Sequence, residues 1–193
     1  MFVKICGLTN LEDTAAAIES GAHAVGFNFC PDSPRFIEPV VLAEWIGQVP
    51  EHIWKVGVFV NENPARVTQI AQMLGLGVAQ LHGRELPEHV PSGLRVWKAA
   101  RVHSGFDFSI LNAFETEALL LDGPASGIPF DWMRAASVPK RVILAGGLCD
   151  DNVQEAITTV KPWGVDACSR LEFSPGKKDP VRMRRFVQAV MSC

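Results

Sequence analysis

The sequence lacks the features that mark membrane, secreted and nucleic-acid-binding proteins. Charges or prolines interrupt every apolar run well before the ~20 residues that a membrane-spanning helix requires. No signal-peptide pattern opens the chain, because strand-like residues already begin at Phe2. The net charge is -3, and the densest basic cluster, residues 182–185, fits the solvated face of a terminal helix. We therefore expect a cytoplasmic protein that binds neither nucleic acid nor membrane.

Paired cysteines are also missing. The five cysteines are odd in number and form no C-x-x-C motif. Neither a disulfide framework nor a zinc knuckle is therefore predicted, and reduced thiols suit a cytoplasmic protein. Cys6 is considered below with the strand that it follows. The other four are interpreted as small packing residues: Cys30, Cys149, Cys168 and Cys193.

What the chain does contain is a repeated alternation of short apolar runs and amphipathic segments. Its 193 residues, 48% of them hydrophobic, suit one compact domain over 1–193, with no linker or low-complexity tract. Strands that alternate with helices pair in parallel, because each crossover returns the chain to the same edge. Eight such units predict an α/β protein with a closed (β/α)8 TIM barrel, and an open doubly wound sheet is the alternative. The predicted strands are 3–7, 24–29, 54–60, 78–83, 95–102, 119–122, 141–145 and 165–168.

Several helix boundaries carry explicit signals. Asn10 can cap a helix that begins at Leu11, and Asp179 can cap the last helix of the chain. Asp150 is predicted to cap the helix that follows the seventh strand. Prolines interrupt residues 84–93, so only a short helix is expected there.

The ends of the predicted strands are unusually polar. In a closed barrel all the C-terminal strand ends open onto one face, where the active sites of this fold lie. The first strand ends on the thiol of Cys6, and the sixth ends on the carboxyl group of Asp122. A thiol and a carboxyl group at one mouth predict acid–base chemistry. The full polar set at these ends is Cys6, Asn28, Asn61, His82, Arg101, Asp122 and Ser169.

Glycines late in the chain indicate a site for an anion. Gly146 and Gly147 follow the seventh predicted strand, and Ser169 and Arg170 follow the eighth. Backbone N–H groups at these turns, together with a helix N-terminus, would bind a phosphate group. A Gly-Gly pair after a strand can also be a plain turn, but its place after the seventh strand favours the anion site.

Eight sequence motifs occur in the order found in one enzyme family. Together they resemble the phosphoribosylanthranilate isomerases of tryptophan biosynthesis, and they extend over nearly the whole chain. The motif with Cys6 and the strand that ends on Asp122 are the specific ones, whereas other phosphate-binding barrels share the glycine turns. The motifs are residues 4–9, 26–29 with 33–35, 56–61, 80–83, 120–122, 130–132, 144–148 and 174–179.

The resemblance implies an Amadori rearrangement of N-(5-phosphoribosyl)anthranilate to 1-(2-carboxyphenylamino)-1-deoxyribulose 5-phosphate. It implies that Asp122, as general acid, protonates the ring oxygen of the ribose. Cys6, as thiolate, would remove the proton from C2. Arg35 would face the anthranilate carboxylate, and His82 would support or contact the substrate.

The resemblance also implies that Gly147, Ser169 and the backbone around Arg170 hold the substrate phosphate. No metal or organic cofactor is expected, because the nitrogen of the substrate supplies the electron sink. The expected partner is a small phosphosugar substrate, and the expected assembly is a monomer or a homodimer.

Two segments depart from the family pattern. Residues 168–170 read Cys-Ser-Arg where the family has small residues, so a side chain replaces a glycine near the phosphate. The loop 123–129 lacks the usual Gly-Thr-Gly-Lys run. Both departures concern affinity more than reaction type. Lys4 is close to Cys6 in sequence but alternates to a different face from Ile5, and we assign it no part in activating the thiol.

Other functions and plainer roles remain as alternatives. A histidine-pathway isomerase would place an aspartate at Cys6, and a pentulose-phosphate epimerase would need His and Asp metal ligands at several strand ends. A non-catalytic phosphate-binding barrel would fit the altered phosphate loops, but not an intact thiol and Asp122. Taken singly, Cys6 could be a core residue, His82 a structural histidine and Arg35 half of a surface ion pair.

Overall fold

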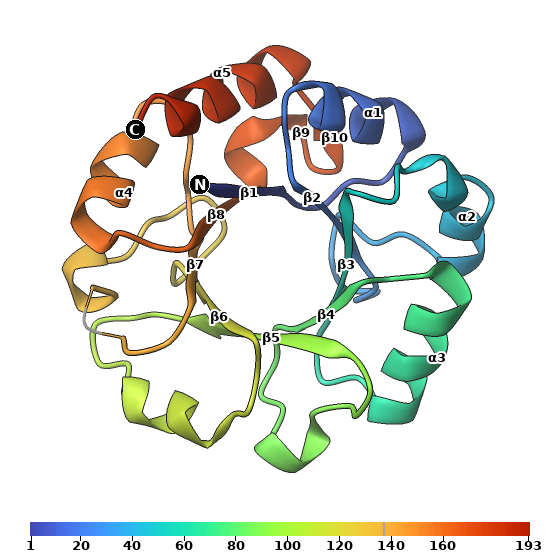
Figure 1. The fold of residues 1–193 in the computed structure, drawn as a ribbon, viewed down its shortest axis with the longest axis horizontal. Coiled ribbons are helices and arrows are strands. Elements are labelled where there is room, and N and C mark those ends of the chain that lie inside the picture. The colour runs from blue at the N-terminus through green and yellow to red at the C-terminus, as the bar shows by residue number, and fades with distance from the viewer. Residues whose placement is uncertain (137) are drawn as a thin grey trace.

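The computed structural model describes residues 1–136 and 138–193, and its centre is a closed barrel of parallel strands in the order β1 to β8 (Figure 1). Pairing of β1 with β8 closes the sheet, which excludes the open doubly wound alternative. The TIM barrel predicted from the sequence is therefore confirmed. The strands are β1 (Phe2–Ile5), β2 (Ala24–Asn28), β3 (Trp54–Phe59), β4 (Val78–Leu81), β5 (Arg95–Arg101), β6 (Ala118–Asp122), β7 (Val142–Leu144) and β8 (Gly164–Ala167).

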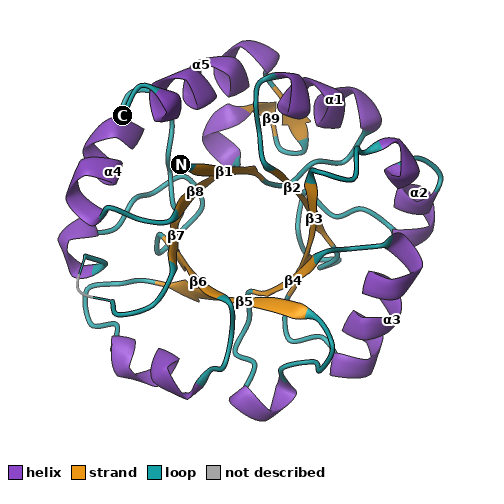
Figure 2. Cartoon of the chain, viewed as in Figure 1, coloured by secondary structure: helices purple, strands orange, loops and turns teal. Residues whose placement is uncertain are grey.

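The helices outside the barrel are unevenly distributed (Figure 2). Full α-helices follow β1, β2, β3, β7 and β8, whereas short 3₁₀ helices follow β4, β5 and β6. Prolines account for the short segment after β4, as the sequence predicted. The α-helices are α1 (Leu11–Glu19), α2 (Pro39–Ala43), α3 (Pro64–Leu74), α4 (Val153–Val160) and α5 (Pro180–Met191). The 3₁₀ helices are η1 (Ile46–Gln48), η2 (Pro87–His89), η3 (Phe108–Ala113), η4 (Trp132–Arg134) and η5 (Ser169–Leu171).

Two of the three predicted helix caps are confirmed. Asn10 accepts a hydrogen bond from the Asp13 N–H at 2.8 Å, and Asp179 caps α5. The prediction for Asp150 is wrong, because the chain turns once more and α4 begins only after Asn152. The Asn152 amide accepts from the Cys149 N–H at 2.9 Å and so stabilises that extra turn.

Aromatic rings close the barrel at the end where the strands begin. Phe2 stacks on Trp163 with ring centroids 4.4 Å apart, and Trp54 stacks on Trp97 at 6.1 Å. Trp97 is completely buried. These rings fill the lower end of the barrel, so the opposite end, where the strands finish, is the one that can hold a ligand.

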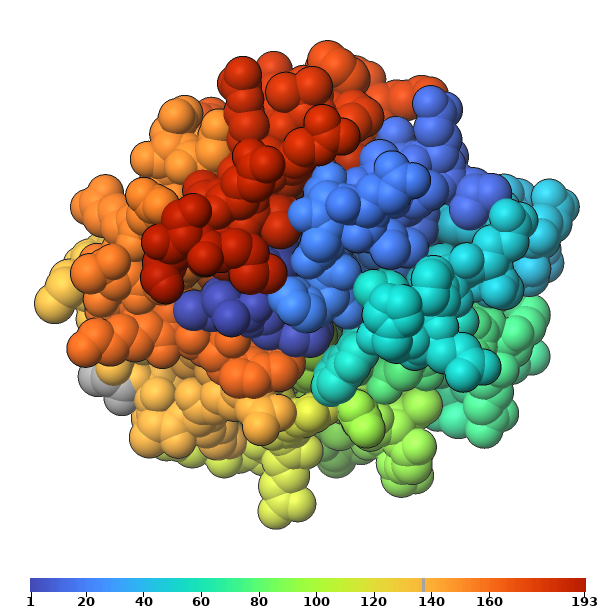
Figure 3. Space-filling model, turned by 45° about the horizontal axis from the view of Figure 1, so that its top comes forward, coloured from blue at the N-terminus to red at the C-terminus, as the bar shows by residue number. Residues whose placement is uncertain are grey.

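Residues after β8 form a small hairpin. It consists of β9 (Glu172–Ser174) and β10 (Lys177–Lys178), which pair antiparallel. From the hairpin the chain enters α5, which packs against α1 and α4. Figure 3 shows the C-terminal residues, in red, next to the N-terminal residues, in blue. None of the helices in the described part of the chain has the length and apolar character needed to cross a membrane.

Candidate active site

The C-terminal ends of the strands surround a cavity of about 630 Å³. Of the polar residues predicted at the strand ends, Asn28 and Arg101 line this cavity. Asn61 lies outside it, and its side chain accepts a hydrogen bond from the Arg84 N–H. The structure thus brings every residue to which the sequence analysis gave a catalytic or binding role to one mouth. These residues are Cys6, Arg35, His82, Asp122, Gly147, Ser169 and Arg170.

A buried ion pair lies directly beneath Cys6. Lys4 and Asp166 are register partners on β1 and β8, and the Lys4 Nζ is 2.8 Å from Asp166 Oδ1. Side chains alternate along a strand, so Lys4 and Cys6 point to the same side and Ile5 to the other. Lys4 alternates away from Ile5, as predicted, and this places it on the same side as Cys6, although the sequence analysis gave it no part in activating the thiol. Lys4 is fully buried inside the barrel and helps to set the charge of the thiol.

The surroundings of Cys6 favour its thiolate form. A hydrogen bond from the Cys168 thiol holds the pKa of Cys6 well below its ordinary value, against the opposing effect of burial. The positive charges of Lys4 and Lys178 lower this pKa further. Because the thiolate is the reactive form of a cysteine, these surroundings make Cys6 a candidate base.

The two neighbouring acids respond in the opposite direction. The hydrogen bond to Cys6 and burial together raise the pKa of Cys168 well above its ordinary value. Burial raises the pKa of Asp166 to about 7, and the Cys6 thiolate adds to this against the attraction of Lys4. Of these three groups, Cys6 is the one whose charged form the surroundings favour.

Asp122 lies at the end of β6 and faces the imidazole ring of His82. Asp122 Oδ1 accepts from the Gly123 N–H at 2.8 Å, and Oδ2 lies 3.4 Å from His82 Nε2. The other ring nitrogen, Nδ1, is 3.2 Å from Gln80 Nε2. An amide nitrogen can only donate, so Gln80 is the donor in this contact. His82 Nε2 lies beside the Asp122 carboxyl group but makes no hydrogen bond within the described residues.

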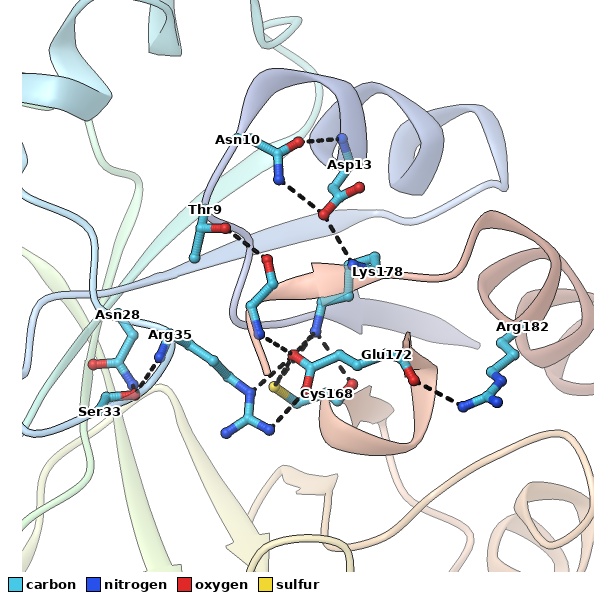
Figure 4. A network of polar contacts seen from close by, with 11 residues as sticks. Thr9, Asn10, Asp13, Asn28, Ser33, Arg35, Cys168, Glu172, Lys178 and Arg182 are labelled. Carbon is cyan, nitrogen blue, oxygen red and sulfur yellow. Dashed lines mark hydrogen bonds and ion pairs between the residues drawn. The ribbon is translucent and has the colours of Figure 1, made fainter. Parts of the chain in front are cut away.

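The guanidinium group of Arg35 is bound to Glu172 in a bidentate pair. Its Nε and Nη2 donate to the two carboxylate oxygens at 2.9 and 2.7 Å (Figure 4). This hydrogen bonding raises the pKa of Arg35, although burial opposes it. Ser33 fixes the Arg35 backbone by accepting from its N–H at 3.1 Å. Arg35 Nη1 has no hydrogen-bond partner within the described residues, which leaves that group for a ligand.

Glycines that follow β7 shape another side of the cavity. Gly146 and Gly147 both have positive φ, at 89° and 67°, a conformation that other residues rarely adopt. A Cβ atom on Gly147 would lie 2.6 Å from the Gly127 carbonyl oxygen, so the loop 123–129 packs directly on this turn. Gly127 in turn lies beside Ser169 and Arg170. The divergent loop and the two residues after β8 therefore form one wall.

Sequence reasoning missed four residues that set these charges. Lys178 was unassigned, yet its Nζ donates to Glu172 at 2.8 Å. Glu172 and Asp166 were overlooked because each pairs with a residue more than a hundred positions away. Cys168 was interpreted as packing. The alternation along β8 could have found Asp166 and Cys168, which lie on the same side of the strand.

Comparisons with known proteins point in one direction. The family model described as N-(5'phosphoribosyl)anthranilate (PRA) isomerase matches residues 3–189. A relative from Solibacter usitatus, named N-(5'-phosphoribosyl)anthranilate isomerase, is 50% identical over 195 residues, which cover 98% of this chain and 96% of the relative.

Solved structures agree over the whole chain. The phosphoribosyl anthranilate isomerase of Thermotoga maritima superposes with a TM-score of 0.93 at 38% identity, covering 100% of both chains. A phosphoribosyl anthranilate isomerase in complex with reduced 1-(o-carboxyphenylamino)-1-deoxyribulose 5-phosphate gives a TM-score of 0.91 at 38% identity, again over 100% of both chains. The architecture and the sequence thus point to the same family.

Proposed function

The chain belongs to the N-(5'-phosphoribosyl)anthranilate isomerase family, and we propose that the thiol and the carboxyl group at its mouth divide the acid–base work of that enzyme. It is an aldose–ketose isomerase of tryptophan biosynthesis. The reaction is the Amadori rearrangement of N-(5-phosphoribosyl)anthranilate to 1-(2-carboxyphenylamino)-1-deoxyribulose 5-phosphate.

In the first step Asp122 acts as general acid. Its protonated carboxyl group gives a proton to the ring oxygen of the ribose, the C1–O bond breaks, and the nitrogen lone pair forms an iminium. His82 Nε2 lies beside this carboxyl group, 3.4 Å from Asp122 Oδ2. A positioned proton transfer of this kind contributes about 10²–10⁴-fold to the rate.

In the second step the Cys6 thiolate acts as general base. It removes the proton from C2, and the electrons of that bond form the C1–C2 double bond and neutralise the iminium nitrogen. The resulting enolamine tautomerises to the ketone. The lowered pKa of Cys6, caused by Cys168 and Lys4, supports this role, because the base must be charged before the proton moves.

The binding groups hold the two ends of the substrate apart. Arg35 Nη1 is free for the anthranilate carboxylate, while Glu172 fixes the rest of the guanidinium plane. The backbone at Gly147 and Ser169, with the charged side chain of Arg170, would bind the phosphate. No metal or organic cofactor enters this scheme, since the nitrogen of the substrate supplies the electron sink.

The observation that carries the proposal is the shared cavity. Cys6 follows β1 and Asp122 ends β6, yet both line one mouth, together with Arg35, Gly146 and Gly147. Turnover can be measured from the decay of phosphoribosylanthranilate fluorescence with purified protein. We expect Cys6→Ser and Asp122→Asn each to lower kcat by about 10²-fold or more.

Matched controls separate these roles from general effects of substitution. Cys193 and Asp107 are both exposed, so Cys193→Ser and Asp107→Asn make the same chemical changes away from the cavity and should keep the wild-type rate. Near wild-type turnover by both Cys6→Ser and Asp122→Asn would show that the roles are wrongly assigned.

We further propose a cytoplasmic enzyme that acts without nucleic acid, as a monomer or a homodimer. The isomerase of Thermotoga maritima is a dimeric enzyme from which monomers have been generated and solved. Light scattering on the purified chain would distinguish the two assemblies.

A further inference from the structure

Two thiols lie next to one another at the mouth, at the ends of adjacent strands. Ile5 on β1 is in register with Ala167 on β8, and the Cys6 N–H donates to the Ala167 carbonyl at 3.0 Å. Cys6 and Cys168 are therefore the next pair in register. They point into the barrel, as Lys4 and Asp166 do two residues earlier, and both line the cavity.

The backbone around the pair leaves room for sulfur next to sulfur. Gly7 has a φ of 72°, and a Cβ atom there would lie 2.8 Å from Cys168 Sγ. A Cβ atom on Gly26 would lie 2.8 Å from Cys6 Sγ. The missing side chains of these two glycines thus create the space in which the two sulfurs sit.

Glu172 is a poor acceptor for the thiol proton of Cys168, because its Oε1 already accepts other hydrogen bonds. Glu172 Oε1 is 4.0 Å away and already accepts from Arg35, Lys178 and the Gly176 N–H, at 2.9, 2.8 and 3.3 Å. An oxygen that already accepts three closer hydrogen bonds has little capacity for a fourth. The remaining acceptor is the sulfur of Cys6.

Lys178 supports the same direction of donation. Its Nζ donates to the Cys168 carbonyl at 3.2 Å and lies 3.6 Å from Cys168 Sγ. A sulfur that accepts from an ammonium group becomes a better donor through its own S–H, because neighbouring hydrogen bonds polarise one another.

We propose that Cys168 is a positioning residue of the isomerase, which donates its thiol proton in a hydrogen bond to Cys6 and so maintains Cys6 as the thiolate. The proposal deepens the proposed function, because it explains what keeps the base ionised in a buried site. It assigns a role to the residue that stands where the family pattern has a small residue after the eighth strand.

Several charged groups face this pair from the elements around it, and the pair titrates as a unit with them. Lys4 and Lys178 are each held in an ion pair beside the two sulfurs, with Asp166 and Glu172 as their partners. Asp166 itself titrates with a pKa raised to about 7 by burial. The groups that face the pair are Lys4 on β1, Asp166 on β8, Arg35 after β2, Glu172 on β9, Lys178 on β10, and His82 and Asp122 across the cavity.

The test is the rate at which iodoacetamide alkylates Cys6, followed by mass spectrometry of its peptide over a series of pH values under reducing conditions. Only the thiolate reacts, so this rate reports its population without any need for turnover. Below the ordinary thiol pKa, Cys168→Ala should slow alkylation of Cys6 by about 10-fold, because it removes a hydrogen bond to a charged group. Cys168→Ser restores a donor and should stay within about 3-fold of wild type. In the pH profile of kcat/KM, the acidic limb should move to higher pH in Cys168→Ala but stay in place in Cys168→Ser.

Cys193→Ala is the matched control, because its exposed thiol lies at the end of the chain, and it should leave the Cys6 rate unchanged. Cys168→Val, which lacks a donor but fills the space, takes the place of Cys168→Ala if that variant does not fold. The proposal is overturned if Cys168→Ala or Cys168→Val alkylates Cys6 with the same pH dependence as wild type. It is also overturned if Cys168→Ser slows alkylation as much as Cys168→Ala. If alkylation behaves as expected but Cys6→Ser keeps full turnover, Cys6 is not the base, while the hydrogen bond from Cys168 to Cys6 is still supported.

Discussion

At the scale of single residues, the charge on Cys6 depends on side chains beneath and beside it. Lys4 supplies a positive charge from the layer below, and Asp166 holds that charge in place at 2.8 Å. Breaking such a buried pair is costly, because the remaining charge is left without a partner. The ion pair therefore couples the stability of the barrel to the ionisation of the mouth.

This coupling predicts a pH dependence of stability. The pKa of Asp166 is raised from 3.8 to about 7, with burial as the largest cause. Between these values the native state keeps a proton that the unfolded chain has released, so this group makes the free energy of unfolding fall as pH rises. The fall is complete above about pH 7. In Asp166→Asn this contribution disappears, so the slope over that interval should be less negative than in wild type.

Urea unfolding of both proteins at several pH values measures the two slopes. Asp166→Asn should also be less stable at every pH, since Lys4 loses its partner, but that offset does not alter the slope. Parallel curves for the two proteins would mean that Asp166 is not a titrating group in this interval.

The residue scale also shows where sequence reasoning succeeds and fails. The position of Cys6 and Asp122 at one mouth could be predicted, because each lies at the end of an apolar strand and a closed barrel brings such ends together. The contact of Arg35 with Glu172 spans 137 positions, and no local pattern indicates it. Lys4 was given no role, although strand alternation puts it on the same side as Cys6.

At the scale of elements, side-chain caps fix where the helices begin. Asp179 Oδ1 accepts from the N–H groups of Val181 and Arg182 at 2.9 and 3.2 Å at the start of α5. This helix packs against α1 and α4, and the hairpin that carries Glu172 and Lys178 leads directly into it. The cap therefore also determines where that hairpin ends.

We expect Asp179→Ala to lower the free energy of unfolding by about 1 kcal/mol, because two N–H groups lose their acceptor. Asp150→Ala is the matched control, since Asp150 was predicted to cap α4 but does not occupy the cap position. Its effect should stay within about 0.5 kcal/mol. Equal losses for the two variants in thermal or urea unfolding would contradict the assignment of the caps.

Long elements were predictable and the shortest were not. The first turn of α3 carries Pro64, and Gly75 ends the helix in a left-handed conformation, so both boundaries carry a signal. The strands β9 and β10 have only three and two residues, too few for alternation to appear. They contribute Glu172 and Lys178, which explains why part of the charge network could not be predicted.

At the scale of the whole molecule, the barrel brings the two ends of the chain together. The mouth depends on this closure, since Cys6 follows β1 and Cys168 follows β8. We propose that residues 1–193 form one domain for this reason. Arrangement of eight strands in a ring gives several strand ends access to one substrate, and it lets an acid and a base approach the same sugar from different strands.

The central claim is that Asp122 opens the sugar ring and Cys6 then removes the C2 proton. The most direct test is the rate of a single turnover with substrate carrying hydrogen or deuterium at C2, in wild type and in both variants. In Cys6→Ser, proton removal becomes the slow step, so a large primary isotope effect should accompany the slower rate. In Asp122→Asn, ring opening becomes slow and the isotope effect should vanish. An isotope effect that appears in Asp122→Asn but not in Cys6→Ser would contradict this division of roles.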